Sequence, residues 1–256
     1  MQEYQSFIKK IYQSIGLDLS LYKEAQMKRR LTSLRNRRGY SNFDDYYQAI
    51  TRDSTLMEEF LDKITINVSE FYRNPNRWRV LEETILPAMR KKKDRIKIWS
   101  AACSTGEEPY TLSIIAQQFW DKKDISIIAT DIDDNVLAHA KQGLYKERAL
   151  QEVNPEIKKK YFSQVADTYK IVDDIKFPIT FNKHNLLADP FPKDMDLIVC
   201  RNVLIYFTDE AKEELYRKFS RALAEDGIFF VGSTEQIFNP ENYELKVHDT
   251  FFYQKI

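Results

Sequence analysis

Apolar and polar positions follow two different patterns along the chain, and the change falls near residue 68. Before that point apolar residues recur at helical spacing, with no β-branched alternating run, so we expect helices throughout. Ser41 precedes an expected helix at residues 42–50, whose first turn carries Asp44 and Asp45, a combination that favours a helix start. The pattern therefore predicts a small all-helical domain over residues 1–68.

From Ile96 onward, short apolar runs alternate with helical patterns. Repeated β-α-β units of this size indicate a parallel sheet covered on both faces. Two short β-like runs at residues 244–247 and 250–254 predict an antiparallel hairpin at the sheet edge. Strands are expected at residues 96–101, 125–130, 179–181, 196–200 and 228–231, and helices at residues 107–120, 136–140 and 210–223.

The alternation breaks between Pro155 and Pro178. A charged helix at residues 157–161 leads to β-like runs at 169–172 and 175–177, which flank Asp173-Asp174. This order predicts a small β insertion with an acidic turn, at about residues 163–180. The fold class is therefore α/β, with a helical domain at 1–68 and a second domain at 69–256 that carries an antiparallel insertion.

Composition narrows the class of protein. The 256 residues are 43% apolar and 30% charged, and Lys+Arg and Asp+Glu balance at 39 each, so only local clustering can favour a charged partner. No apolar run approaches the roughly 18–20 residues of a membrane span, and the start of the chain does not resemble a secretory signal. Cys103 and Cys200 are expected to be reduced thiols of a cytoplasmic protein, and no metal site is expected from three histidines.

The stretch 21–38 is strongly basic and contains a single acid, Glu24. On a helix, Met27, Leu31 and Leu34 form one apolar stripe flanked by cations. One interpretation is a solvated surface helix whose long side chains cover a packed stripe. The other is a docking face for an acidic helical partner or a nucleic acid. The candidate docking residues are Lys28, Arg29, Arg30, Arg35, Arg37 and Arg38.

Small residues occupy the turn after the first expected strand, at Ala102, Ser104 and Gly106. Such residues let the backbone approach a ligand closely. Asp131 ends the second strand, 25 residues past Gly106, where an acid typically accepts hydrogen bonds from ribose hydroxyls. A strand-end Asp can instead cap the next helix, but Asp133 is available for that role. Together these features predict a nucleoside-bearing cofactor.

The helix after this turn begins with Glu107-Glu108, where a dinucleotide would place its diphosphate. Two carboxylates would repel that dianion, but they suit the cationic methionine end of S-adenosylmethionine. The expected terminal hairpin favours the same choice by fold analogy. We therefore expect S-adenosylmethionine as cofactor and S-adenosylhomocysteine as product.

Five segments carry a recognisable pattern, namely residues 67–73 (NVSEFYR), 101–110 (AACSTGEEPY), 129–133 (ATDID), 184–187 (HNLL) and 200–207 (CRNVLIYF). Together they resemble the CheR-type chemoreceptor glutamate methyltransferases, and the resemblance covers essentially the whole chain. It implies a small helical domain followed by a Rossmann-like class I methyltransferase domain with a small inserted antiparallel β subdomain.

The resemblance also implies roles at the methionine end of the cofactor. Asn67, Ser69 and Arg73 are expected to approach the methionine part and the transfer site. Glu108 is expected to take the cofactor amino group, with Glu107 as the alternative.

At the nucleoside end, the resemblance implies that Asp131 holds the ribose. Asn185 and Leu186 are expected to bind the adenine by hydrogen bond and packing, and Asn202 with Val203 to line the pocket. A structural alternative stays open, in which Asn67 and Asn202 only tie loops.

The resemblance places Arg73 and Tyr206 nearest the accepting carboxylate. A glutamate side chain has a pKa of about 4.3, so it is ionised near neutrality and needs no general base. We therefore expect that the main requirement is to align the carboxylate for attack on the methyl group. Tyr206 has an alternative role as a packed aromatic with a satisfied hydroxyl.

The implied partners are methyl-accepting chemotaxis receptors, whose glutamate-rich helical bundles the basic stretch would steer. Some relatives grip a receptor pentapeptide with a glycine-containing loop in the insertion. This chain has no glycine between Leu144 and Gly227, so pentapeptide-independent recognition is expected. The protein is expected to be cytoplasmic, without membrane insertion, and recruited to membrane receptor arrays.

Two other functions fit parts of the sequence. One is an RNA methyltransferase that binds through the basic stretch, although only Tyr22 and Tyr40 lie near it for base stacking, and no nucleic-acid partner is expected. The other is a non-catalytic module that senses the cofactor, which intact Arg73, Asp131 and Tyr206 disfavour.

Overall fold

The computed structural model describes residues 2–65 and 69–256. The chain divides into two compact units, one made of Met1–Asn67 with Val203–Leu215 and the other of Val68–Asn202 with Tyr216–Ile256. Residues 203–215 therefore belong to the helical unit, although they follow a strand of the second unit in the sequence.

The first unit is helical throughout its described residues, as the apolar spacing predicts. In its core, the Phe7 ring contacts the rings of Phe43, Tyr46 and Phe60 at centroid distances of 4.8–6.2 Å. The unit contains α1 (Gln2–Ile15), η1 (Leu19–Leu21), α2 (Glu24–Arg37), α3 (Phe43–Arg52), α4 (Ser54–Thr65), η5 (Leu204–Tyr206) and the first half of α11 (Asp209–Ala222).

Helix α3 begins one residue later than expected and ends two residues later. The cap is Asn42 and not Ser41, because the Asn42 side-chain oxygen accepts a hydrogen bond from the Asp45 backbone N–H at 2.8 Å. This bond satisfies one of the free N–H groups of the first turn.

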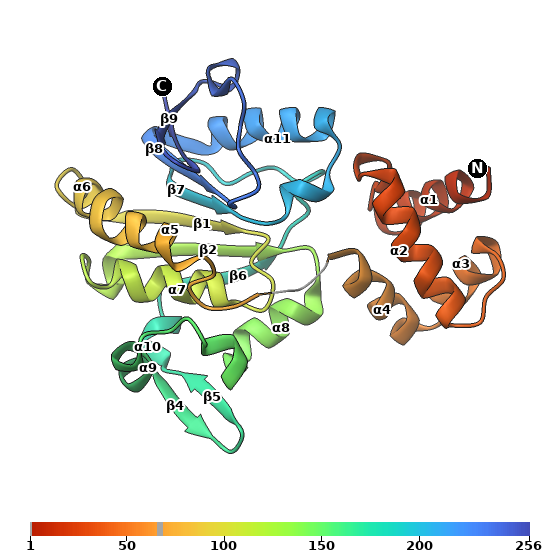
Figure 1. Ribbon diagram of the computed structural model, residues 1–256, viewed down its shortest axis with the longest axis horizontal. Helices are drawn as coiled ribbons and strands as arrows, with labels where there is room; N and C mark the ends of the chain where they lie inside the picture. The colour runs from red at the N-terminus through yellow and green to blue at the C-terminus, as the bar shows by residue number, and fades with distance from the viewer. Residues whose placement is uncertain (1, 66–68) are drawn as a thin grey trace. The chain divides into compact units, whose positions relative to one another are not determined.

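The second unit contains a seven-stranded sheet in the order β6-β2-β1-β7-β8-β10-β9 (Figure 1). All neighbouring strands are parallel except β10, which is antiparallel to both β8 and β9, so the predicted terminal hairpin is confirmed. Every residue of β7 is buried, as in a parallel sheet covered on both faces. The strands are β1 (Ile96–Ala101), β2 (Ile125–Asp131), β6 (Ile179–Lys183), β7 (Met195–Cys200), β8 (Leu223–Val231), β9 (Leu245–Asp249) and β10 (Phe252–Lys255).

The helices of this unit alternate with the strands. Helix α7 ends at Ala116, four residues before the predicted end, and turns follow it. Besides the second half of α11, the helical elements around the sheet are α5 (Pro75–Val80), the π-helical turn η2 (Leu81–Ile85), α6 (Leu86–Arg90), α7 (Glu107–Ala116), η3 (Lys122–Asp124), α8 (Asp134–Gln142) and η6 (Pro240–Tyr243).

A three-stranded antiparallel sheet, in the order β3-β5-β4, forms the insertion (Figure 1). Its first strand precedes the expected start at about residue 163. The elements are β3 (Leu144–Lys146), η4 (Glu147–Leu150), α9 (Pro155–Tyr161), β4 (Phe162–Val165), β5 (Thr168–Ile171) and α10 (Asp173–Lys176).

The predicted acidic turn of the insertion is wrong. The β4–β5 hairpin turns at Ala166-Asp167, where Ala166 has a φ of 53°. Asp173 and Asp174 instead form the first turn of α10, where acids are favoured, and the Phe177 N–H donates to the Asp173 carbonyl at 3.0 Å. Residues 175–177 are consequently not a strand.

Across residues 2–65 and 69–256, no helix is both long enough and apolar enough to cross a membrane.

Candidate functional site

Strands β2, β1 and β7 are neighbours in the sheet and run parallel. Their carboxyl ends therefore lie at one edge, which is where open α/β sheets bind ligands. This edge brings together the turn after Ala101, the Asp131 carboxyl and the segment after Cys200.

The turn after β1 has left-handed backbone at the three small residues that the sequence singled out. Ala102, Ser104 and Gly106 have φ values of 63°, 50° and 96°, in the region that favours glycine. A Cβ added at Gly106 would lie 2.9 Å from the Ala140 Cβ and 3.0 Å from the Tyr145 hydroxyl. The backbone of this turn can therefore pack closely against α8 and approach a ligand.

Asp131 is buried at the tip of β2 with both carboxyl oxygens facing the backbone. Its Oδ2 accepts from the Ser104 N–H at 2.8 Å, and its Oδ1 accepts from the Asp133 N–H at 3.1 Å. Asp133 caps α8 by accepting from the Asn135 N–H at 2.8 Å, as predicted. Burial raises the pKa of Asp131 to about 6. A carboxylate can accept about four hydrogen bonds, so Asp131 has acceptor capacity left for a ribose hydroxyl.

Two carboxyl groups open helix α7, of which Glu107 is buried and the Glu108 side chain is 14% exposed. Glu108 accepts a hydrogen bond from the Ser100 hydroxyl at 2.8 Å, and its other oxygen lies 3.8 Å from Nη1 of Arg201. Burial raises the pKa of Glu108 to about 7, against the opposing effect of the Arg201 charge. Glu107 accepts from the Thr105 hydroxyl at 2.7 Å. Only Glu108 shares its surroundings with the strand ends of both β1 and β7, so it suits a cationic amino group better.

Arg73 lies in a tightly fixed loop before α5. Its carbonyl oxygen accepts from Nε1 of Trp78 at 2.9 Å and from Nη2 of Arg201 at 2.7 Å. The flanking residues Tyr72 and Asn74 have φ values of 53° and 61°, so the loop backbone is strained on both sides of Arg73. The Arg73 charge also lies close enough to lower the pKa of Glu108, after the larger effects of burial, Arg201 and Ser100.

Arg201 is a site residue that the sequence analysis quoted only as part of a segment. Its side chain is 3% exposed, and its guanidinium carbon lies 5.1 Å and 4.9 Å from the ring centroids of Trp78 and Phe230. Burial lowers the pKa of Arg201, and the nearby Glu108 opposes this shift. An arginine directly after a fully buried strand is the signal that could have marked it.

Glu235 is a second residue that the sequence analysis missed. Its Oε2 accepts from the Asn202 N–H at 2.6 Å and from the Gly232 N–H at 2.8 Å. Asn202 has a φ of 61°, and a Cβ at Gly232 would collide with the Glu235 carboxylate. The carboxylate thus joins the ends of β7 and β8 and fixes Asn202 beside the candidate site.

The loop after β6 holds Asn185 and Leu186. The Asn185 side-chain oxygen accepts from the Leu187 N–H at 3.0 Å, and the Asn185 N–H donates to Asp189 at 2.8 Å. Leu186 is 7% exposed. The Asn185 oxygen thus ties its own loop, and adenine binding by the two residues stays a prediction.

Four further predicted site residues belong to other segments of the chain. Asn67 lies outside the described residues, and Ser69 is partly exposed. Val203 and Tyr206 belong to the helical unit, where the Tyr206 carbonyl accepts from the Lys23 N–H at 2.9 Å. Their pairing with the strand ends therefore stays a prediction.

Helix α2 buries Met27, Leu31 and Leu34, which confirms the apolar stripe. Many of its cationic side chains contact other residues of the helical unit. Arg37 and Arg38 each lie 2.6 Å from the Glu59 carboxylate. The other contacts are Arg35 with Glu3 and the Phe43 ring, Lys28 with the Tyr4 ring, and Arg30 with the Tyr206 ring.

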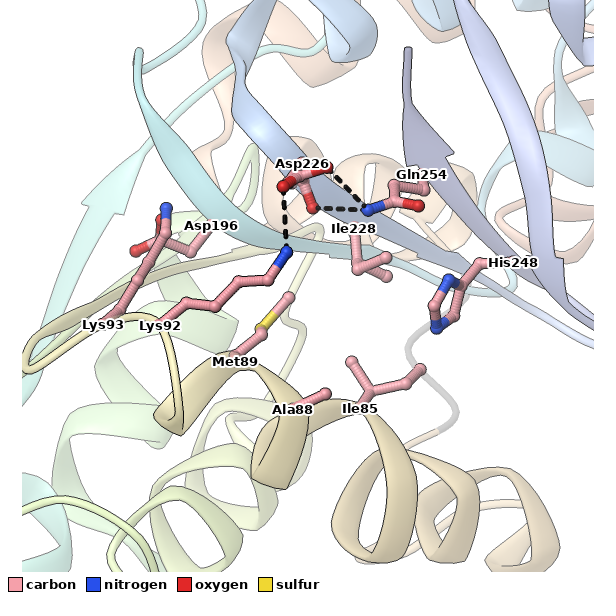
Figure 2. A pocket seen from close by; sticks show the side chains of 11 residues that line it. Ile85, Ala88, Met89, Lys92, Lys93, Asp196, Asp226, Ile228, His248 and Gln254 are labelled. Carbon is pink, nitrogen blue, oxygen red and sulfur yellow. Dashed lines mark hydrogen bonds and ion pairs between the residues drawn. The ribbon is translucent and has the colours of Figure 1, made fainter.

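A pocket with an empty volume of about 520 Å³ lies far from this edge. Figure 2 shows Ile85, Ala88 and Met89 facing Ile228, with the Lys92 ammonium 3.1 Å from Asp226. It adjoins the starts of β7 and β8, opposite to the carboxyl ends, so it is separate from the candidate site. Within residues 2–65 and 69–256, no group of three or more His, Cys, Asp and Glu side chains could hold a metal ion.

Comparison with known proteins assigns both parts of the chain to one family. Residues 67–252 match the family described as "CheR methyltransferase, SAM binding domain", and residues 2–65 match "CheR methyltransferase, all-alpha domain". The chain is 42% identical to a chemotaxis protein methyltransferase of Listeria innocua, over 99% of this chain and 97% of that protein. It is 33% identical to a chemotaxis protein methyltransferase of Borreliella burgdorferi, over 97% and 93% of the two chains.

Proposed function

The chain belongs to the CheR methyltransferase family and is an S-adenosylmethionine-dependent methyltransferase, and we propose that it esterifies glutamate side chains of chemotaxis receptors with the residues named below. The observation that carries this assignment is a pair of carboxyl groups at one edge of the sheet, Glu108 in the first turn of α7 and buried Asp131 at the tip of β2.

The carboxyl groups of Glu108 and Asp131 suit the two ends of the cofactor. The Glu108 carboxyl, with its raised pKa, would ionise beside a cationic amino group, and Asp131 would accept from the ribose hydroxyls. When bound, the cofactor supplies a methyl group on a positively charged sulfur. Ser69 and Asn67 would contact its methionine part, and the Asn185-Leu186 loop its adenine.

Arg73 is assigned to the accepting carboxylate. Its guanidinium would hold one carboxylate oxygen by a charge-assisted hydrogen bond while the other attacks. Trp78 and Arg201 fix the Arg73 backbone in advance, so little freedom is lost on binding. Tyr206 would set the angle of attack.

No proton needs to move in this reaction. The bound cofactor would supply the methyl group and keep the electron pair of its carbon–sulfur bond, and Arg73 with Tyr206 would hold the acceptor oxygen in line with that bond. Because the positive charge on sulfur and the negative charge on the acceptor disappear together, alignment of the two reactants is the main requirement. Alignment can lower the activation barrier by on the order of 7–11 kcal/mol.

We assign docking to residues 1–68 and methyl transfer to residues 69–256. Glutamate-rich helical bundles of receptors would meet the basic helix α2, where exposed Arg29 is available for long-range attraction. The two-residue turn of the β4–β5 hairpin, Ala166-Asp167, supports recognition that does not use a receptor pentapeptide. The enzyme would act in the cytoplasm at receptor arrays.

The test is transfer of tritium-labelled methyl groups from S-adenosylmethionine to receptor-containing membranes. Methyl esters of glutamate release labelled methanol in base, whereas methylated RNA does not. We expect base-labile label in the receptor band. Label in added RNA alone, or no label in any fraction, would reject the proposal in favour of an RNA methyltransferase or a non-catalytic module.

A further inference from the structure

The segment that carries Tyr206 is built into the helical unit by backbone bonds. The Lys23 N–H donates to the Tyr206 carbonyl at 2.9 Å, and the Thr208 N–H donates to the Leu21 carbonyl at 2.9 Å. The rings of Tyr22 and Phe207 meet edge to face with centroids 5.0 Å apart. The backbone on both sides of Tyr206 is therefore fixed, and its ring is the part left to position.

Arg30 contacts that ring. Its guanidinium carbon lies 5.1 Å from the centroid of the Tyr206 ring, within the range of about 6 Å for attraction between a cation and a ring face. Arg30 projects from α2 next to the buried Leu31, so its own backbone is anchored in the core. Half-buried Arg30 differs in this respect from its exposed neighbour Arg29.

We propose that Arg30 is a positioning residue for methyl transfer, which holds the Tyr206 ring by its face. The inference rests on the proposed role of Tyr206 in setting the angle of attack. A cation over the ring limits rotation of the side chain, and in-line transfer is sensitive to small changes of angle. The basic helix thus has two separable effects, attraction of the acidic receptor by its exposed cations and alignment through Arg30.

The two effects separate in steady-state kinetics with receptor membranes and the full-length protein. Loss of an exposed attracting charge raises KM, whereas loss of alignment lowers kcat. We expect Arg30→Ala to lower kcat roughly two- to fivefold, the range that corresponds to a partly exposed cation–ring contact. Arg30→Lys should recover most of the loss because it keeps a cation, and Arg29→Ala should raise KM without lowering kcat.

A double-mutant cycle identifies the ring as the target of Arg30. In a Tyr206→Phe background, which keeps the ring, Arg30→Ala should still lower kcat. In a Tyr206→Leu background it should cause no further loss. Circular dichroism would verify that each variant is folded.

Two results would overturn the inference. If Arg30→Ala only raises KM, as Arg29→Ala does, or if its loss of kcat persists in the Tyr206→Leu background, Arg30 does not act through the ring. The proposed function stands in both cases as long as Tyr206→Leu itself slows transfer. If Tyr206→Leu transfers methyl groups at the wild-type rate, the assigned role of Tyr206 fails as well.

Discussion

Nη2 of Arg201 donates a hydrogen bond to the backbone carbonyl of Arg73 at 2.7 Å, across 128 positions of sequence. Nε1 of Trp78 donates to the same oxygen at 2.9 Å. The guanidinium of Arg201 lies next to the rings of Trp78 and Phe230 and near Glu108, so one buried cation connects the loop of Arg73 with the first helix of the candidate cofactor site. This connection makes the site a single prearranged cluster.

Replacing Arg201 should therefore destabilise the fold and impair the site together. Arg201→Ala leaves Glu108 without its buried cationic neighbour and removes one donor from the Arg73 carbonyl. We expect a loss on the order of 3 kcal/mol in the free energy of unfolding, measured by urea denaturation. The control is Arg95→Ala, which breaks the ion pair of a largely exposed arginine with Asp124 and should cost less than about 1 kcal/mol. Equal losses for the two variants would contradict the account.

Arg73→Ala should nearly abolish turnover while cofactor affinity stays close to normal. The variant loses a charge-assisted hydrogen bond to the acceptor, which corresponds to a rate loss of roughly ten- to hundredfold. The measurement is labelled methyl transfer with the purified protein, next to calorimetric binding of S-adenosylhomocysteine. Arg73→Lys should retain part of the activity because it keeps the charge. Near-normal transfer by Arg73→Ala would remove this residue from the mechanism.

Glu108 should make the ligand-free protein less stable as the pH rises. Burial raises its pKa to about 7, above the value of about 4.3 in an unfolded chain, so the folded state binds more protons between these values. The stabilising effect is fully present below the unfolded pKa and is lost as the pH rises through about 7. Asp131, with a pKa of about 6, acts in the same direction.

The check is the difference in thermal stability between the wild type and Glu108→Gln from pH 5 to pH 8. We expect the variant to gain stability relative to the wild type over this range, because its side chain stays neutral. Bound S-adenosylhomocysteine should reduce the difference, because a cationic amino group favours ionised Glu108. A difference that does not depend on pH would show that this carboxyl does not titrate as described.

Charge reversal at Arg30 and Arg37 together should weaken receptor methylation and leave cofactor binding intact. We expect kcat to fall because Arg30 no longer holds the Tyr206 ring, and we expect a higher KM at low ionic strength that shrinks as salt is added, because salt screens exposed charges beyond about 10 Å at 0.1 M. Lys91→Glu with Arg95→Glu is the matched control, since both residues are exposed on the methyltransferase unit. An unchanged methylation rate at low ionic strength would argue against docking through α2.

Local rules predicted the turn after β1 well. Ala102, Ser104 and Gly106 all have left-handed backbone, and the run of small residues that marks this turn is visible in the sequence. The sequence also distinguished the roles of Asp131 and Asp133, because one residue ends a strand and the other caps the next helix. These features depend on neighbours in the chain.

Arg201 and Glu235 were not predictable in the same way. Each acts on backbone groups that only the order of the strands brings near, Arg201 on Arg73 and Glu235 on Asn202. The predicted strand at residues 175–177 of the insertion was wrong for the opposite reason, because local β propensity was misleading there. The β-forming residues 175–177 suggested a strand, but the acids that precede them and the packing of buried Ile175 favour a short helix.

The most direct test of the account is a crystal structure of the protein with S-adenosylhomocysteine. The account predicts the ligand along the carboxyl ends of β2, β1 and β7, with its amino group within hydrogen-bond distance of the Glu108 carboxylate and its ribose hydroxyls on Asp131. A ligand bound elsewhere, or with its amino group on another acid and its ribose away from Asp131, would contradict it.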